Sequence, residues 1–424
     1  MPSAAYRKFR KLVTNPRRFF EDARLKRQVD NLAGARQTLK EASDQYHQGN
    51  IEAAYQHASQ LPALLPAKAL FLAKLSLYRH QAEEAEQLAF SALQLSSPFA
   101  GEFREAFYLH QEALRFQYKY HDALILLRSM LFKDESARFF RALRLACIGA
   151  KQQSEFEQRL LRYTPQHTAW LRARNHYLLL LRDLGQQKRA IAEARLLMLE
   201  VFNQDAGEPK PHKERSEAKK RAWQAKAATA LHQLKEDLAG SGIEFFLVSG
   251  TLLGCVREGA ILGHDSDIDV GVMPDVSMKQ LRESLTQSSR FKFQEIFHEN
   301  TLYLVHPNGV KIDVFRHYEE QGKLYHGGIK CRWWNSPFTL QYRTFLGDEY
   351  LVPDDEDKYL TENYGDWRTP IIDFETFLDT PNLEVSHPTN MALYHAAQAI
   401  ASHRGGRPDR VERYKEAFNR LTQS

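Results

Sequence analysis

The stretch FLVSGTLLGCVREGAILGHDSDIDVGV, Phe246–Val272, decides the fold of the second half of this chain. An apolar run predicts a short buried strand, a turn of small residues follows, and three acids then stand at alternate positions, Asp265, Asp267 and Asp269. Because side chains alternate along a strand, Asp267 and Asp269 share one face. Like charges on one face repel unless a cation lies between them, and oxygen-only ligation favours Mg²⁺ or Mn²⁺ over zinc. The stretch therefore predicts a divalent-metal site beside a turn that accepts phosphate.

A second stretch, LYLVHPNGVKIDVF at Leu302–Phe315, predicts a β-hairpin that carries a third carboxylate. Its NG dipeptide lies between two apolar runs, and we expect both turn residues to take positive φ angles. The returning strand presents Asp313, which can complete a metal site or accept a proton from a hydroxyl nucleophile. A lone strand aspartate is more often an edge residue, but together with Asp267 and Asp269 it forms a stronger set.

Together, several motifs in this half resemble the LicD and fukutin family. The family carries a GTLLG turn, an arginine shortly after it and an aspartate cluster before a DIDV strand, as this chain does between Gly250 and Val272. Further similarity lies in KIDVF from Lys311, in Val352-Pro353 followed by acidic residues, and in YGDW from Tyr364 with a proline beyond it. These pieces stand in the family's order over roughly residues 225–375. The resemblance implies a nucleotidyltransferase-like fold.

The resemblance also implies roles for individual residues. Asp267 and Asp269 match the metal-binding pair and Asp313 the third acid, and all three are expected to be catalytic. The residues matched to the donor-binding part of the site are Ser249, Gly250, Thr251 and Arg257. His264 and Lys311 are further candidates for contact with donor phosphates, against the alternatives of a turn residue and a surface charge. The family commonly has Pro-Trp before its aspartates where this chain has Gly263-His264.

The expected function follows from the resemblance and agrees with the chemistry of the residues. Family members move a phosphorylated alcohol, such as phosphocholine or ribitol phosphate, from a CDP-linked donor onto a glycan and release CMP. Opening a diphosphate requires its charge to be neutralised and the nucleophile to be placed in line, which a divalent ion does. One alternative is a nucleotidyltransferase that acts on a sugar phosphate or another small acceptor. The other is an interaction scaffold whose transferase domain is inactive.

Apolar residues follow helical spacing almost throughout residues 32–202, and the pattern repeats. Five sequences that predict a tight turn and a helix start recur, and their aligned apolar positions are 32, 38, 33 and 34 residues apart: Ala53, Ala85, Ala123, Phe156 and Ala190. This spacing is close to the tetratricopeptide period of about 34 residues. It predicts a solenoid of helical hairpins whose surface holds a protein partner or the glycan, with an irregular helical bundle as the alternative.

Composition places the chain in a broad class. The net charge of +5 gives no argument for nucleic acid, and none is expected as a partner. Three widely spaced cysteines favour a reducing cytoplasm. Residues 1–30 are basic with interspersed aromatics, a pattern typical either of contact with an anionic membrane surface or of a solvated arm. We therefore expect a cytoplasmic protein, with peripheral contact to the inner membrane face.

The predicted organisation is an α+β multidomain protein. A basic amphipathic segment (1–30) precedes an all-α, tetratricopeptide-like domain (31–203). A Pro- and charge-rich linker (204–222) leads to an α/β nucleotidyltransferase-like domain with a mixed sheet (223–380) and a helical extension (381–424).

Overall fold

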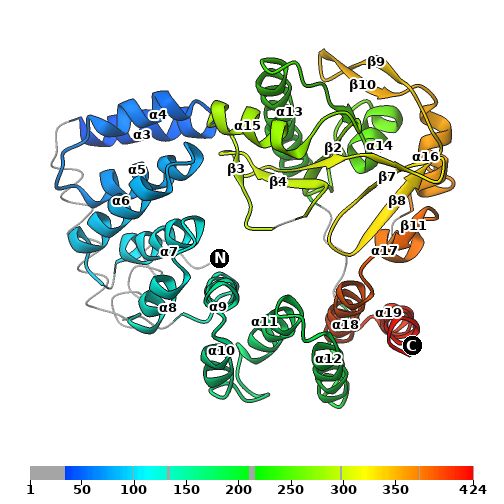
Figure 1. Cartoon of the computed structure of the whole chain (residues 1–424), viewed down its shortest axis with the longest axis horizontal. Helices are drawn as coiled ribbons and strands as arrows, with labels where there is room; N and C mark the ends of the chain where they lie inside the picture. Colours follow the sequence, from blue (N-terminus) through cyan, green and yellow to red (C-terminus); the bar gives the residue numbers. More distant parts are fainter. Residues whose placement is uncertain are drawn as a thin grey trace. The chain divides into compact units, whose positions relative to one another are not determined.

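The computed structural model describes residues 34–98, 100–130, 134–209, 215–296, 298–371 and 373–423. The chain divides into two compact units between Leu180 and Leu181, coloured along the sequence in Figure 1. The basic segment 1–30 lies outside the described residues, as does the middle of the predicted linker. Within the described ranges, no helix combines the length and the apolar character needed to cross a bilayer.

The first unit consists of successive packed helices. They are α3 (Ala35–His47), α4 (Ile51–Ser59), α5 (Pro66–Tyr78), α6 (Ala82–Leu95), α7 (Gly101–Phe116), α8 (Tyr120–Arg128), α9 (Ala137–Ala150), α10 (Gln153–Leu160) and most of α11 (Trp170–Asp183). Small residues such as Ala85 and Ala123 are fully buried where neighbouring helices approach each other. At the first predicted position the buried residue is Ala54 rather than Ala53. The alignment was therefore wrong by one residue there.

Five turns along the helical region share one geometry. In each, a residue with positive φ ends a helix, and the next residue donates its N–H to the carbonyl oxygen five positions earlier, as in a Schellman cap. These positive-φ residues are Gly49, His80, Tyr118, Lys151 and Gly185. Each of these turns reverses the chain between two helices. The recurrence of such turns along the chain therefore accounts for the repeated sequence pattern. A tetratricopeptide-type repeat in the strict sense stays a prediction.

The second unit contains a seven-stranded mixed sheet in the order β3-β4-β5-β2-β1-β10-β9. Its strands are β1 (Phe246–Leu247), β2 (Asp267–Val272), β3 (Lys292–Phe293), β4 (Thr301–Val305), β5 (Lys311–Arg316), β9 (Leu340–Phe345) and β10 (Asp348–Pro353). β2 is parallel to β5 and β1 is parallel to β10, whereas the other neighbours are antiparallel. The mixed α/β character predicted for this region is confirmed.

A smaller sheet has the order β11-β8-β7-β6 and was not anticipated from the sequence. Its strands are β6 (Tyr318–Glu320), β7 (Lys323–Gly327), β8 (Cys331–Asn335) and β11 (Leu383–Val385). His317 and His326 are fully buried on its inner side, with ring centroids 4.7 Å apart, and burial lowers the pKa of both imidazoles, to about 4 for His317. The pair is therefore neutral at physiological pH.

The hairpin between β4 and β5 differs from its predicted form. Gly309 has φ 92°, but Asn308 is not among the residues with positive φ. The Asn308 side chain instead accepts a hydrogen bond from the Val310 N–H at 3.0 Å, and the His306 N–H donates to the Val310 carbonyl at 2.8 Å. The loop is thus longer than a two-residue turn, and a longer loop needs only one left-handed residue, which is the glycine.

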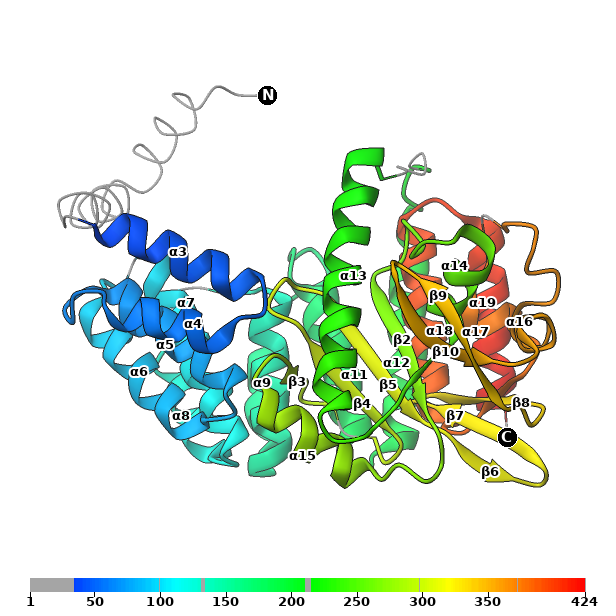
Figure 2. The same ribbon diagram turned by 90° about the horizontal axis from the view of Figure 1, so that it is seen from above.

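Helices of the second unit cover the sheets and support the site. They are α12 (Gln187–Phe202), α13 (Glu217–Ala239), α14 (Ser249–Glu258), α15 (Met278–Ser288), α16 (Glu356–Tyr364), α17 (Thr376–Asp379), α18 (Pro388–Arg404) and α19 (Pro408–Thr422). Figure 2 shows α13 along the large sheet, where it contacts β2 and α15. α12, which the sequence pattern placed with the repeats, packs against α18 in this unit. Residues with complete burial, such as Phe246 and Leu231, form the core between these layers, and each large apolar side chain contributes roughly 2 kcal/mol.

Candidate active site

The site is centred on the acids of β2 and β5. Ile268 and Val270 point into the core with no exposure, so the alternation of the strand turns Asp267 and Asp269 toward the opposite face. Because β2 and β5 are parallel and in register, Asp313 pairs directly with Asp269. The predicted trio therefore meets on two adjacent strands.

The carboxylates of this cluster repel one another. Burial, followed by the charge of Asp267, raises the pKa of Asp265 and of Asp313 to about 7 each, and the same causes hold the pKa of Asp269 well above its usual range. The positive charges of Lys311 and Lys330 offset the effect on Asp313 only in part. Asp265 belongs to the sequence motif but was not expected in the site. The cluster thus has four acids rather than three.

The first turn of α14 contacts the acids. The Thr251 hydroxyl accepts a hydrogen bond from the Asp269 N–H at 2.9 Å. The backbone N–H of Gly250 lowers the pKa of the Asp269 carboxylate, against the larger effects of burial and of the neighbouring acids. A Cβ on Gly250 would lie 2.7 Å from Asp265 Oδ2, so any larger residue here would displace the Asp265 carboxylate. Ser249, at the first position of the helix, has φ 48°, a conformation that costs energy for a residue with a side chain.

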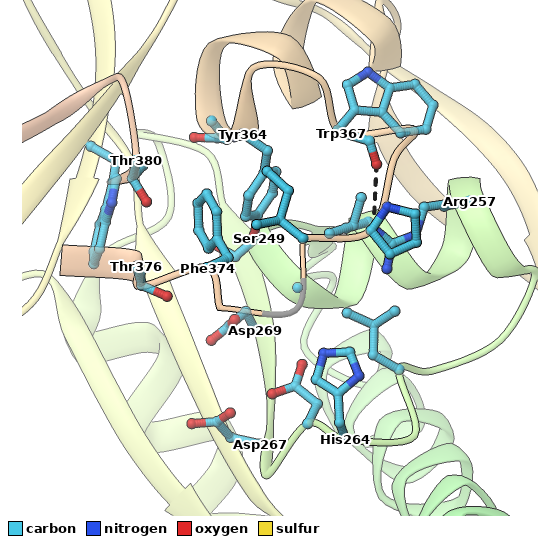
Figure 3. Close-up of a pocket in the computed structure, with 18 of the residues that line it drawn as sticks. Ser249, Arg257, His264, Asp267, Asp269, Tyr364, Trp367, Phe374, Thr376 and Thr380 are labelled. Atoms are coloured by element: carbon cyan, nitrogen blue, oxygen red, sulfur yellow. Dashed lines mark hydrogen bonds between the residues drawn. The ribbon is translucent and has the colours of Figure 1, made fainter. Parts of the chain in front are cut away.

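These acids and this turn line a cavity of about 500 Å³. Asp267 and Asp269 extend into it, and Phe374 and Tyr364 face them across the space (Figure 3). The volume lies within the range of about 300–1,000 Å³ of small-molecule sites. The cavity therefore has the size for a nucleotide-linked donor.

Most of the predicted site residues line this cavity. They are Ser249, Gly250, Arg257, His264, Asp267, Asp269 and Asp313. His264 is exposed. Arg257 Nη1 donates to the Trp367 carbonyl at 3.3 Å and Arg257 Nη2 lies 3.0 Å from Glu258 Oε1, while its buried Nε has no hydrogen-bond partner among the described residues. An anion in the cavity would give this guanidinium its missing acceptor.

Two predicted residues lie elsewhere. Thr251 is buried behind the cavity, where it supports Asp269 rather than facing a ligand. Lys311 pairs with Asp267 across the parallel strands and lines a neighbouring cavity that does not include the turn.

Sequence reasoning missed much of the wall opposite the acids. That wall includes Tyr364, Phe374, Thr376, Phe377 and Thr380. Tyr364 and Trp367 belong to the YGDW motif used for the resemblance, and that motif was the signal that could have placed them here. The others come from the segment between α16 and α18, which gave no signal of its own.

The type of donor atom in the acidic cluster indicates which metal ions it could bind. Among the described residues, no three His, Cys, Asp or Glu side chains converge closely enough to form a ready-made metal site. The donors are nevertheless all carboxylate oxygens, the type that Mg²⁺ and Mn²⁺ prefer. Their raised pKa values show that negative charge is poorly compensated here. The chemistry of the donor set fits a divalent cation.

Comparison with known proteins gives the same assignment for this part of the chain. Residues 242–355 match the family described as LicD/FKTN/FKRP, nucleotidyltransferase domain. The chain is similar to ribitol-5-phosphate transferase FKTN of Mus musculus, at 28% identity over 174 residues, which cover 38% of this chain and 37% of that protein. The human protein of the same name is 26% identical over 173 residues, covering 38% of each chain.

A bacterial protein also matches. The uncharacterized protein RP689 of Rickettsia prowazekii is 26% identical over 163 residues, which cover 36% of this chain and 60% of that protein. The chain thus spans less than two fifths of the length of the FKTN proteins it matches. Both the motifs of the sequence and these matches place residues 242–355 in the LicD/FKTN/FKRP family of nucleotidyltransferase domains.

Proposed function

We propose that this chain is a metal-dependent phosphotransferase that moves a phospho-alcohol from a CDP-linked donor to a hydroxyl of a cell-surface glycan and releases CMP. The observation that carries the proposal is the cluster of carboxylates at the Gly250 turn, inside a cavity of about 500 Å³. The matched relatives named ribitol-5-phosphate transferase support a phospho-alcohol, of which ribitol phosphate, glycerol phosphate and phosphocholine are candidates.

Asp267, Asp269 and Asp313 would hold Mg²⁺ or Mn²⁺. When bound, the ion would neutralise the donor diphosphate and lower the barrier to phosphoryl transfer. A cation also removes the repulsion that raises the pKa values of these acids, so binding and catalysis would use the same residues. Metal dependence is therefore part of the proposal.

The other residues orient the donor. The first turn of α14, from Ser249, presents backbone N–H groups, and the start of a helix favours phosphate oxygens. Arg257 also lines the cavity and offers a buried Nε–H that has no hydrogen-bond partner within the described ranges. His264 is exposed at the edge of the space and can reach a phosphate oxygen of a bound donor.

Asp313 would serve either as a third ligand of the ion or as the base that takes the proton of the acceptor. Burial and the charge of Asp267 raise its pKa to about 7, which suits a base in the arrangement where Asp267 and Asp269 alone hold the ion. The acceptor oxygen would form a bond to the phosphorus that carries the alcohol, the bond from that phosphorus to CMP would break, and the acceptor proton would pass to Asp313. CMP would leave with the electron pair of the broken bond.

The remaining partners are proposals of the same kind. The acceptor would be a glycan at the membrane, which the basic residues 1–30 would approach through anionic headgroups. The helical unit would hold a protein partner or part of the glycan.

The test is to incubate the full chain with Mg²⁺ and CDP-ribitol, CDP-glycerol or CDP-choline and to measure CMP. Asp269→Ala should lower CMP release by about two to three orders of magnitude, since the site loses a charge that acts on the reacting phosphate. Asp275→Ala is the matched control, because this exposed acid follows the same strand but is not among the residues that line the cavity. Near-normal turnover of Asp269→Ala, or pyrophosphate release from a nucleoside triphosphate in place of CMP, would refute the proposal.

A further inference from the structure

A second cavity of about 280 Å³ adjoins the first. Asp267 and Asp313 line both cavities, as do Trp333 and Phe377. Ser249, Gly250 and Arg257 line only the first, whereas Lys311 and Lys330 line only the second. The acids therefore form a shared wall, with the phosphate-accepting turn on one side and two lysines on the other.

Lys330 is fixed in the connection between β7 and β8. Its carbonyl accepts a hydrogen bond from the His387 N–H at 3.1 Å, and the neighbouring Ile329 carbonyl accepts one from the Asn390 side chain. Its ammonium lies 4.4 Å from the centroid of the Phe377 ring and 5.2 Å from that of Tyr394. These contacts to α17 and α18 hold the charge at the edge of the second cavity.

Among the residues that the structure describes, the ammonium of Lys330 has no partner in an ion pair. Burial lowers its pKa, and Asp313 is the carboxylate whose charge acts on it. Across the described ranges, however, no carboxylate oxygen lies within ion-pair distance of Lys330 Nζ. A desolvated cation held only by aromatic rings is a favourable partner for an anion that enters the cavity.

The two-sided arrangement agrees with the geometry of phosphoryl transfer. The attacking and leaving oxygens lie roughly in line on opposite sides of the phosphorus. If the donor occupies the cavity at the Gly250 turn, the acceptor must approach from the other side of the acids. A volume of about 280 Å³ is near the lower limit of about 300 Å³ for ligand sites, so it suits one sugar residue with one substituent.

We propose that the second cavity binds the acceptor, and that Lys330 selects acceptor sugars that carry an anionic group, a phosphate or a carboxylate, near the reacting hydroxyl. This inference rests on the proposed transferase function for its reaction. Lys330 is a specificity residue in this scheme and moves no proton. Trp333 and Phe377, which border both cavities, provide apolar faces for the sugar ring.

The experiment compares wild type, Lys330→Gln, Lys330→Arg and Lys323→Gln as full-length proteins. Lys323 is a matched control, because its ammonium also lies over an aromatic ring, 3.6 Å from the centroid of Trp334, but it lines neither cavity. Calorimetric titration measures binding of N-acetylglucosamine 6-phosphate, glucuronic acid and neutral N-acetylglucosamine, and a separate titration with CDP reports on the donor side.

Wild type should bind at least one of the two anionic sugars more than tenfold more tightly than neutral N-acetylglucosamine. Lys330→Gln should abolish that preference, Lys330→Arg should restore part of it, and Lys323→Gln should keep it. CDP affinity should change less than twofold in all variants. Preference for the phosphate over the carboxylate identifies which anion the cavity takes.

Several results would overturn the inference. One is equal binding of all three sugars to wild type, and another is an equal effect of the Lys330 and Lys323 substitutions. A third is a loss of CDP affinity in Lys330→Gln, which would place the lysine on the donor side. Because binding is measured without turnover, these results are distinct from a failure of the transferase proposal, which shows as absence of CMP release while the binding preference remains.

Discussion

Replacing Asp313 by asparagine should stabilise the metal-free protein while it removes activity. The pKa of Asp313 is raised from 3.8 to about 7 by burial and by the charge of Asp267. Between pH 3.8 and about pH 7, the Asp313 carboxyl loses its proton in the unfolded chain but keeps it in the folded chain. The free energy of unfolding is therefore highest below about pH 4 and falls as the pH rises to about 7. The amide side chain introduced by Asp313→Asn cannot ionise, so the variant lacks this loss.

The magnitude follows from the size of the shift. A difference of about 3 pKa units, at about 1.4 kcal/mol each, sets an upper limit of about 4 kcal/mol. Asp313 is only half-buried and lines a cavity open to water, so we expect a gain of about 1–2 kcal/mol after screening. The gain should be small at pH 4.5 and largest at pH 8.

Urea denaturation of wild type and Asp313→Asn in EDTA, at both pH values, measures this difference. Tryptophan fluorescence reports mainly on the second unit, because it contains four of the five tryptophans: Trp223, Trp333, Trp334 and Trp367. Added Mg²⁺ should stabilise wild type more than the variant. A stability difference that does not change with pH, or a variant less stable than wild type at pH 8, would refute the account of the acidic cluster.

Three further substitutions test other parts of the second unit. His326→Gln should reduce the loss of stability on acidification, because burial lowers the pKa of His326 below its usual 6.5 and the unfolded chain takes up the proton first as the pH falls. Thermal denaturation should show that the melting temperature falls less between pH 7.5 and pH 5 in the variant than in wild type, and an equal fall would contradict this reasoning. Thr251→Val should lower the free energy of unfolding, measured by urea denaturation, by about 1–2 kcal/mol, since the Asp269 N–H loses its acceptor. An unchanged denaturation midpoint would contradict this role of Thr251. Arg257→Gln should weaken CDP binding about tenfold by calorimetry, with lysine at this position restoring little of it; unchanged affinity would exclude Arg257 from the donor side.

The centre of the site could be predicted from the sequence because its determinants are local. The DIDV motif specifies which face of the strand its aspartates occupy, and the parallel register of β2 and β5 then places Asp313 beside Asp269. The register depends on which strands pair, which the sequence did not show; the resemblance to the family supplied only the match of Asp313 to the third acid. The small-residue turn at Gly250 was also predicted from adjacent residues. In the structure, however, the backbone N–H of Gly250 acts on the Asp269 carboxylate.

The rest of the site depends on contacts over long sequence separations. Phe374 and Thr376 reach the cavity from residues more than 100 positions after the acids of β2, in a segment without periodic pattern. The small sheet with the buried His317–His326 pair consists of strands of three to five residues, too short to show alternation. Asp265 was visible as an acid, but its place in the cavity depends on how the loop before β2 folds back on Gly250.

If the donor diphosphate binds at the first turn of α14, its oxygens would compete with the Asp269 carboxylate for the N–H of Gly250. The competition would weaken the hold on Asp269 as the donor enters. In the proposed reaction this glycine would thus couple substrate entry to the freedom of the acid.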